Sequence, residues 1–116
     1  MIPLLRAYRP DLILVSAGFD AAHGDVGCCK ATADGKAVSG ADLRPEDFDY
    51  ITRQICKVAN VCCEGRVVSV LEGGYGSWVK NKGDDPKRME LNRDGFAKCV
   101  SSHVLGLSGL SQELFY

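Results

Sequence analysis

Two apolar runs of the chain have the length and composition of buried β-strands. They cover residues 12–15 and 67–71, and each leads directly into a segment that contains glycine. A continuous apolar run, in place of an alternating one, is typical of a strand that is covered on both faces, as in a parallel sheet. We therefore expect both strands to belong to an α/β sheet with helices packed against it.

Helical spacing of apolar positions marks three further segments. Residues 1–8 have the pattern of the last turns of a helix, which must end before Pro10 because a proline pushes the preceding residue out of the α region. A second helix begins at Pro45, carries acidic residues in its first turn and ends at Gly65. Its expected apolar face consists of Phe48, Ile51, Ile55, Val58, Ala59 and Cys62. A last amphipathic helix follows, and its expected apolar face consists of Phe96, Val100, Val104 and Leu107.

The order of these elements predicts a strand–loop–helix–strand unit, in which the two strands run parallel and the crossover is right-handed. The loop over residues 21–44 contains four glycines, and loops of this length inside a domain are commonly functional. After Tyr75 the chain becomes polar and turn-rich through residue 86. We find no internal repeat and no domain linker.

The segments that follow the two strands, SAGFD at 16–20 and LEGGY at 71–75, hold the residues best suited to chemistry. Sites in open α/β sheets form beyond the carboxyl ends of parallel strands, so Asp20 and Tyr75 can face one cleft. An acidic metal ligand and a phenolic donor in one cleft suggest metal-assisted hydrolysis. Gly73 and Gly74 allow a backbone bend and the close approach of a ligand. The alternatives are that Asp20 caps the turn after it and that Tyr75 packs beside a turn.

The same residues resemble the C-terminal part of a zinc-dependent histone deacetylase of the class II type. The resemblance rests on residues 9–21, which contain AGFDA, and on residues 70–75, which contain LEGGY, in this order and with a helix between them. It implies that residues 1–116 form the C-terminal part of a three-layer α/β/α arginase/deacetylase-type domain with a parallel sheet, whose upstream part is missing.

The resemblance also implies roles for individual residues. Asp20 would be one of three ligands of a catalytic Zn²⁺, Tyr75 the catalytic donor to the oxyanion of the tetrahedral intermediate, and Gly73 and Gly74 part of the substrate-binding loop. The other two ligands of the family, an Asp-x-His pair, and its paired general-base and general-acid histidines do not occur in this sequence. We therefore expect the segment alone to be inactive.

The implied reaction is hydrolysis of acetyl-lysine amides in histones or other proteins, with corepressor proteins as candidate partners and the nucleus or cytoplasm as location. Two alternatives stay open. One is a deacetylase of small molecules such as acetylated polyamines, and the other is a non-catalytic, truncated module that binds a partner protein.

Composition and charge exclude several other classes. A chain that is 46% hydrophobic and 25% charged has the composition of a globular domain and not of a disordered segment. The net charge of −1 gives no broad basic surface for nucleic acid. No apolar run approaches the ~20 residues that a membrane-spanning helix needs, and the first residues lack the pattern of a secretory leader.

The remaining candidates for chemistry are cysteines and histidines. The six cysteines are Cys28, Cys29, Cys56, Cys62, Cys63 and Cys99, and their adjacent pairs lack the C-x-x-C spacing of a structural zinc site. We expect them to be reduced and structural. We expect His23 at the surface, His103 at the surface or at an interface, and Phe19 packed beneath the loop. Glu72 is assigned no catalytic role.

Overall fold

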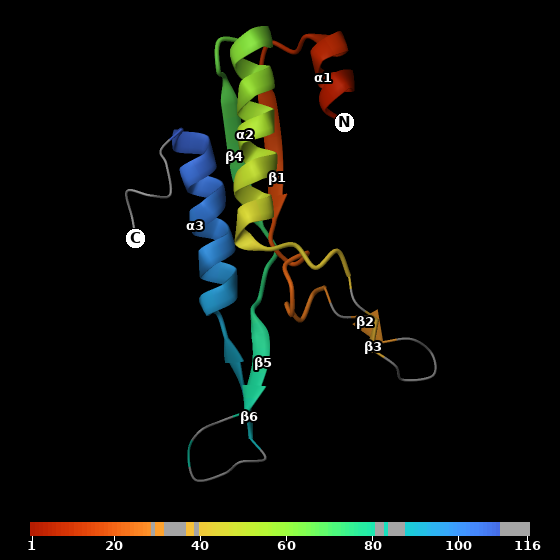
Figure 1. The fold of residues 1–116 in the computed structure, drawn as a ribbon, viewed down its shortest axis with the longest axis vertical. Helices are drawn as coiled ribbons and strands as arrows, with labels where there is room; N and C mark the ends of the chain where they lie inside the picture. The colour runs from red at the N-terminus through yellow and green to blue at the C-terminus, as the bar shows by residue number, and fades with distance from the viewer. Residues whose placement is uncertain (29, 32–36, 39, 81–82, 84–87, 110–116) are drawn as a thin grey trace.

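The structure is a computed structural model that describes residues 1–28, 30–31, 37–38, 40–80, 83 and 88–109. Within these described residues, three helices and six strands follow one another (Figure 1). They are α1 (Ile2–Tyr8), β1 (Ile13–Gly18), β2 (Lys30–Ala31), β3 (Ala37–Val38), α2 (Pro45–Cys62), β4 (Val67–Glu72), β5 (Ser77–Lys80), β6 (Met89–Asn92) and α3 (Asp94–Ser108).

The expected strand–loop–helix–strand unit is present. β1 and β4 pair in parallel, with a register that runs from Ile13 opposite Val67 to Gly18 opposite Glu72. Both strands therefore end at the same edge of the sheet, and the segments that follow them leave the sheet together. At the opposite edge, the Arg66 Nε donates to the Asp11 carbonyl at 3.0 Å, which joins the starts of the two strands.

Helix α2 crosses one face of the β1–β4 pair, with α3 beside it (Figure 1). A Cβ added at Gly106 of α3 would lie 2.9 Å from the Thr52 Cβ, so a glycine is needed where the two helices approach each other. The core between α2 and the strands consists of Ile13, Ile55, Val58, Ala59 and Cys63. The predicted face of α2 is largely confirmed, except that Ile51 is exposed and Thr52 is buried instead.

A second cluster of buried residues lies at the edge of the sheet where β1 ends. Phe19 is 1% exposed. The centroid of its ring lies 5.1 Å from the ring centroid of Phe48 and 6.1 Å from that of Phe96. This confirms that Phe19 packs beneath the loop. Burial of such a side chain stabilises a fold by roughly 1.5–3 kcal/mol, and here it anchors the residue that directly precedes Asp20.

The outer face of the β1–β4 pair is largely exposed. Leu14 is 72% exposed, Val68 49% and Val70 56%, because side chains alternate along a strand and α2 covers only the other side. A strand composition that suits burial on both faces is thus matched, within the described residues, by cover on one face. The molecule is accordingly flat, measuring 54 × 39 × 19 Å along its principal axes.

The ends of α2 follow simple local rules. The Arg44 side chain at the N-cap position makes no capping hydrogen bond. The Asp47 carboxylate instead accepts a hydrogen bond from the Arg44 N–H at 2.8 Å. An acidic side chain in the first turn thus compensates for the missing Ser or Thr cap. Gly65, at φ +77°, ends the turn after the helix in the left-handed region that favours glycine.

The segment after Tyr75 contains more regular structure than its polar composition predicts. β5 and β6 form an antiparallel hairpin in which Trp78 lies opposite Leu91. The connecting residues 81–82 and 84–87, which include most of the predicted turn, lie outside the described residues. The prediction of a turn-rich connection is thus wrong for residues 77–80, where the aromatic Trp78 and the β-branched Val79 favour a strand.

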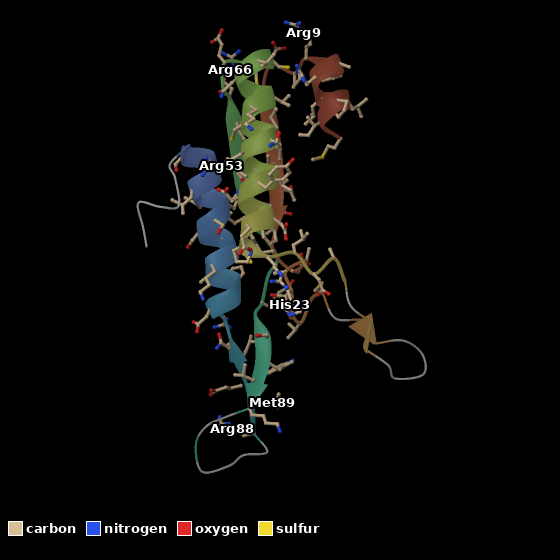
Figure 2. The ribbon with its side chains drawn as sticks, in the orientation of Figure 1. Arg9, His23, Arg53, Arg66, Arg88 and Met89 are labelled. Atoms are coloured by element: carbon tan, nitrogen blue, oxygen red, sulfur yellow. The ribbon has the colours of Figure 1, made fainter. Side chains whose placement is uncertain are left out.

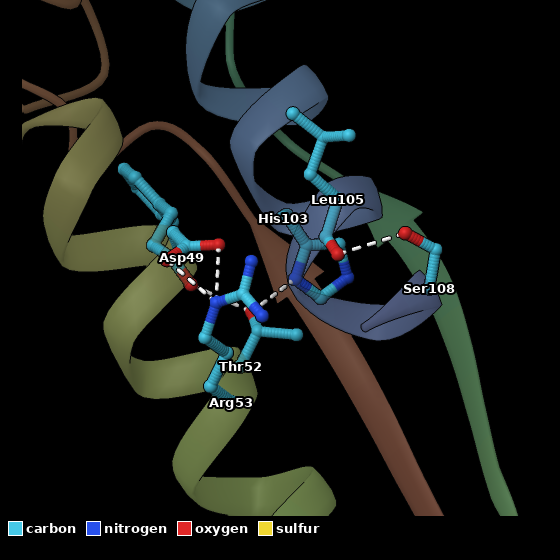
Figure 3. A network of polar contacts seen from close by, with 7 residues as sticks. Asp49, Thr52, Arg53, His103, Leu105 and Ser108 are labelled. Carbon is cyan, nitrogen blue, oxygen red and sulfur yellow. Dashed lines mark hydrogen bonds and ion pairs between the residues drawn. The ribbon is translucent and has the colours of Figure 1, made fainter. Parts of the chain in front are cut away.

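His103 is buried, with 4% of its surface exposed, so the expectation of a surface or interface position is wrong. Its Nδ1 lies 2.7 Å from the Thr52 Oγ1 (Figure 3). Its Nε2 lies 2.8 Å from the Ser69 Oγ. The Thr52 hydroxyl donates its proton to the Phe48 carbonyl at 2.6 Å. His103 Nδ1 must therefore carry a proton and donate to Thr52, and Nε2 accepts from Ser69.

The cysteines agree with the expectation as far as the structure describes them. Cys28, Cys56, Cys62, Cys63 and Cys99 carry free thiols, while Cys29 lies outside the described residues. Burial raises the pKa of the Cys56 thiol, which keeps it protonated and unreactive. None of the helices in the described part of the chain is both long and apolar enough to cross a membrane.

Candidate functional site

The candidate site lies where β1 and β4 end side by side. Beyond the last pair of the register, the Phe19 N–H donates to the Gly73 carbonyl at 3.4 Å, so the two segments stay together outside the sheet. Gly73 has φ +63°, and a Cβ added there would lie 3.3 Å from the Asp20 Cγ. The Asp20 side chain therefore lies directly against the backbone of the LEGGY segment.

A third segment, around Gly27, completes this edge. A Cβ added at Gly27 would lie 2.7 Å from the Asp20 Cβ and 3.2 Å from the Tyr75 Cδ2. Asp20 and Tyr75 thus border the same glycine, from two different strands. The expectation that both residues lie on one edge of the sheet is confirmed, whereas the roles assigned to them stay predictions.

Asp20 is half-buried, and a Cβ added at Gly18 would lie 3.1 Å from its Oδ1. Among the described residues, no hydrogen-bond donor contacts its carboxylate. The turn directly after it is closed by the backbone, since the Ala22 N–H donates to the Phe19 carbonyl at 3.1 Å. The side-chain turn of this loop belongs to Asp25, whose Oδ1 accepts from the Gly27 N–H at 2.8 Å.

Tyr75 is 51% exposed, which does not fit a side chain whose purpose is packing. Its backbone, in contrast, is held firmly. The Asp25 Oδ2 accepts from the Tyr75 N–H at 2.8 Å and from the Gly76 N–H at 2.7 Å, and the Val26 N–H donates to the Gly76 carbonyl at 2.8 Å. The loop after β1 therefore fixes the backbone from which the phenol projects.

Sequence reasoning missed Asp25. A local signal was present, since Asp followed two residues later by Gly is typical of an Asx turn. No local pattern could show that the second carboxylate oxygen binds residues 75 and 76, which lie on the far side of the crossover.

The two glycines assigned to substrate binding are required by the protein's own packing. Gly74 has φ +104°, and a Cβ added there would lie 2.6 Å from the Phe96 ring and 2.9 Å from the Phe19 Cβ. Gly73 is held against Asp20, as described above. The close approach that the sequence predicts is thus made to protein atoms, and contact with a substrate stays a prediction.

A cleft of about 770 Å³ lies behind this edge, between the loop after β1, the start of α2 and the start of α3. Asp25, Gly76 and Cys99 contribute to its walls, whereas Asp20 and Tyr75 do not. Burial raises the pKa of the Cys99 thiol, and the carboxylates of Glu46 and Asp25 add to the effect. The thiol is therefore kept protonated and has no nucleophilic role in the cleft.

His23 lies near the middle of the molecule's long axis, far from Arg66 at the other edge of the sheet (Figure 2). Its side chain is 70% exposed, and its Nδ1 lies 3.3 Å from the Asp42 Oδ1. The predicted surface position is confirmed. Glu72 is exposed as well, and its contact is a weak hydrogen bond of 3.4 Å from the Ser16 hydroxyl.

Residues 1–84 match the family model described as the histone deacetylase domain. The chain belongs to the histone deacetylase family. It is 37% identical over 107 residues to a type-2 histone deacetylase 2 of Dictyostelium discoideum. The aligned region makes up 92% of this chain and 5% of that protein. It is also 45% identical over 73 residues to a histone deacetylase 4 of Caenorhabditis briggsae, where the aligned region makes up 63% of this chain and 7% of that protein.

A solved structure shows the same fold. The crystal structure of the HDA15 HD domain superposes with a TM-score of 0.58 at 23% sequence identity, covering 94% of this chain and 22% of that one. The parallel α/β architecture that the sequence predicted is thereby confirmed. The chain spans only a small part of the histone deacetylases it matches, so the activity of a whole deacetylase is a matter for proposal.

Proposed function

We propose that this chain forms part of the catalytic domain of a zinc-dependent protein deacetylase, which hydrolyses acetyl-lysine amides in histones or other proteins. The observation that carries the proposal is the meeting of Asp20 and Tyr75 on either side of Gly27, at the carboxyl edge of a parallel strand pair. Membership of the histone deacetylase family supports the class of reaction.

The Asp20 carboxylate suits one position of a zinc site, because Zn²⁺ accepts carboxylate oxygen as well as nitrogen and sulfur ligands. The described residues contain no group of three His, Cys, Asp or Glu side chains that could hold a metal, so the other ligands would come from outside them. Asp25 already accepts hydrogen bonds from three backbone N–H groups, so we do not assign it to the metal. When bound, the ion would polarise the amide carbonyl and activate water.

Tyr75 is the residue of this chain that we assign to the reacting carbonyl. Attack on an amide places negative charge on the former carbonyl oxygen, and a phenol O–H can donate a hydrogen bond to that charge. The half-exposed ring projects from a backbone fixed by Asp25, so the donor is held in place before the reaction begins. Such preorganised donors contribute mainly to kcat.

Two substitutions in the deacetylase that carries this segment test the proposal. Tyr75→Phe should lower kcat for an acetyl-lysine peptide by about 10²–10³ while zinc content stays normal, because one transition-state donor is lost. Asp20→Asn should lower the bound zinc first, since the amide keeps the shape but loses the ligand charge.

Tyr50→Phe is the matched control, because Tyr50 is 64% exposed and belongs to α2, not to the segments that hold Asp20 and Tyr75. It should leave both readouts unchanged. Normal turnover by Tyr75→Phe with zinc still bound would remove the oxyanion role. Comparing kcat/KM for an acetyl-lysine peptide and an acetylated polyamine tests the substrate class. Corepressor binding and a nuclear or cytoplasmic location stay predictions of the sequence resemblance.

A further inference from the structure

Asp25 is a buried carboxylate, 2% exposed, that no part of the proposed reaction uses directly. Among the described residues, its hydrogen-bond partners are the backbone N–H groups of Gly27, Tyr75 and Gly76, at 2.7–2.8 Å. Hydrogen bonds from N–H groups to a carboxylate are about twice as strong as those between neutral groups. This one side chain therefore joins the loop after β1 to the loop after β4.

The loop after β4 needs such a support. Gly73, Gly74 and Gly76 all have positive φ, between +63° and +104°. Glycines give this backbone its unusual path, but they also leave it with more alternative conformations than other residues would. Tyr75 lies between two of them, so the direction of its side chain depends on what fixes its own N–H and that of Gly76.

We propose that Asp25 is a positioning residue, which sets the place of the Tyr75 phenol by holding the backbone of residues 75 and 76. This inference rests on the proposed function, because it concerns the step that Tyr75 assists. The same carboxylate holds Gly27, which borders both Asp20 and Tyr75. Asp25 therefore fixes two of the three segments that meet at the site.

Asp25→Asn removes this support with almost no change in size. An Asn side chain offers one carbonyl oxygen and one NH₂ group, so it can serve Gly27 or residues 75 and 76, but not both. The remaining backbone N–H would face another donor, and the loop on that side would shift. A shift of about 1 Å near the chemistry can lower a rate by about 10².

The test is a double-mutant cycle in the deacetylase that carries this segment, with an acetyl-lysine peptide as substrate. Asp25→Asn alone should lower kcat by about 10-fold or more and change KM by less than about 2-fold, with zinc content unchanged. In the Tyr75→Phe background the same substitution should change kcat by less than about 2-fold, because the group it positions is already absent. Equal losses in both backgrounds would show a merely structural role and overturn the proposal, as would full activity of Asp25→Asn.

The matched control is Asp42→Asn, which changes a partly exposed carboxylate that contacts His23. It should leave kcat unchanged. If Asp25→Asn fails to fold, amide hydrogen exchange of the unaltered protein decides instead. The Tyr75 and Gly76 N–H groups should exchange slowly although the Tyr75 side chain is half exposed, and exchange at the rate of unprotected amides would overturn the proposal.

The two proposals fail in different ways. A fully active Tyr75→Phe variant contradicts the oxyanion role of Tyr75 in the proposed function, whatever Asp25→Asn does. A slow Tyr75→Phe variant together with a fully active Asp25→Asn variant contradicts only the positioning role.

Discussion

Acidification should destabilise this fold through His103. Burial lowers the pKa of the imidazole, which is 4% exposed and has both nitrogens bound to hydroxyl groups. In the unfolded chain a histidine titrates near pH ~6.5. Below that pH the unfolded state therefore binds a proton that the folded state resists, and the free energy of unfolding falls. The stability is fully present above the unfolded pKa and is lost as the pH falls through the folded pKa.

The structure limits the size of this effect. Protonation at Nε2 would require Ser69 to stop donating and would place a charge in a core site between α2, α3 and β4. A difference of one bound proton changes the free energy of unfolding by at most about 1.4 kcal/mol per pH unit. A domain of this size is stable by about 5–15 kcal/mol, so a loss near this upper limit is a measurable part of it.

The assay is urea unfolding followed by far-UV circular dichroism at pH 7.5, 6.5 and 5.5, a range that stays above the titration of ordinary carboxylates. His103→Gln should be less stable than the unaltered chain at pH 7.5, by about 1–3 kcal/mol, because a buried hydroxyl loses its partner. Its free energy of unfolding should depend less on pH. His23→Gln is the control, since the exposed His23 should leave the pH dependence unchanged. Equal pH dependence of the unaltered chain and His103→Gln would refute the reasoning.

Three other substitutions or measurements test the fold and the site. Phe19→Ala should lower the free energy of unfolding by about 3–5 kcal/mol in urea titrations, because it empties the centre of an aromatic cluster, and a loss below about 1 kcal/mol would contradict that role. Gly74→Ala should lower the thermal midpoint, because the new Cβ would meet Phe96 at 2.6 Å, whereas Gly95→Ala, with nothing within 4 Å of its Cβ, should stabilise α3 by up to about 1 kcal/mol. The isolated chain should bind zinc weakly and hydrolyse no acetyl-lysine peptide, as isothermal titration and a deacetylation assay can show, and tight stoichiometric binding with turnover would contradict Asp20 being a single ligand of a larger set.

The sequence predicts the elements whose causes are local. The apolar runs of β1 and β4, the helical spacing in α2 and the proline and glycine at its ends all act within a few residues, so they could be recognised without a structure. The edge shared by Asp20 and Tyr75 also followed, because parallel strands have their carboxyl ends together.

The errors concern contacts between distant segments. His103 is polar, and its burial depends on Thr52 and Ser69, which come from two other elements. Asp25 likewise finds its partners across the whole crossover. A pattern of apolar positions cannot show a buried polar group, because such a group is stable only when its partners are in place.

The parallel pairing of β1 with β4 has a kinetic consequence. Every pair in its register joins residues that are separated by the whole of the connecting loop and α2. Such contacts form slowly, since a long loop must close before any of them is made, whereas a helix forms from neighbours along the chain. We therefore expect α2 to be structured early and the β1–β4 register late. The edge that brings Asp20 and Tyr75 together would then be completed only in the last stage of folding.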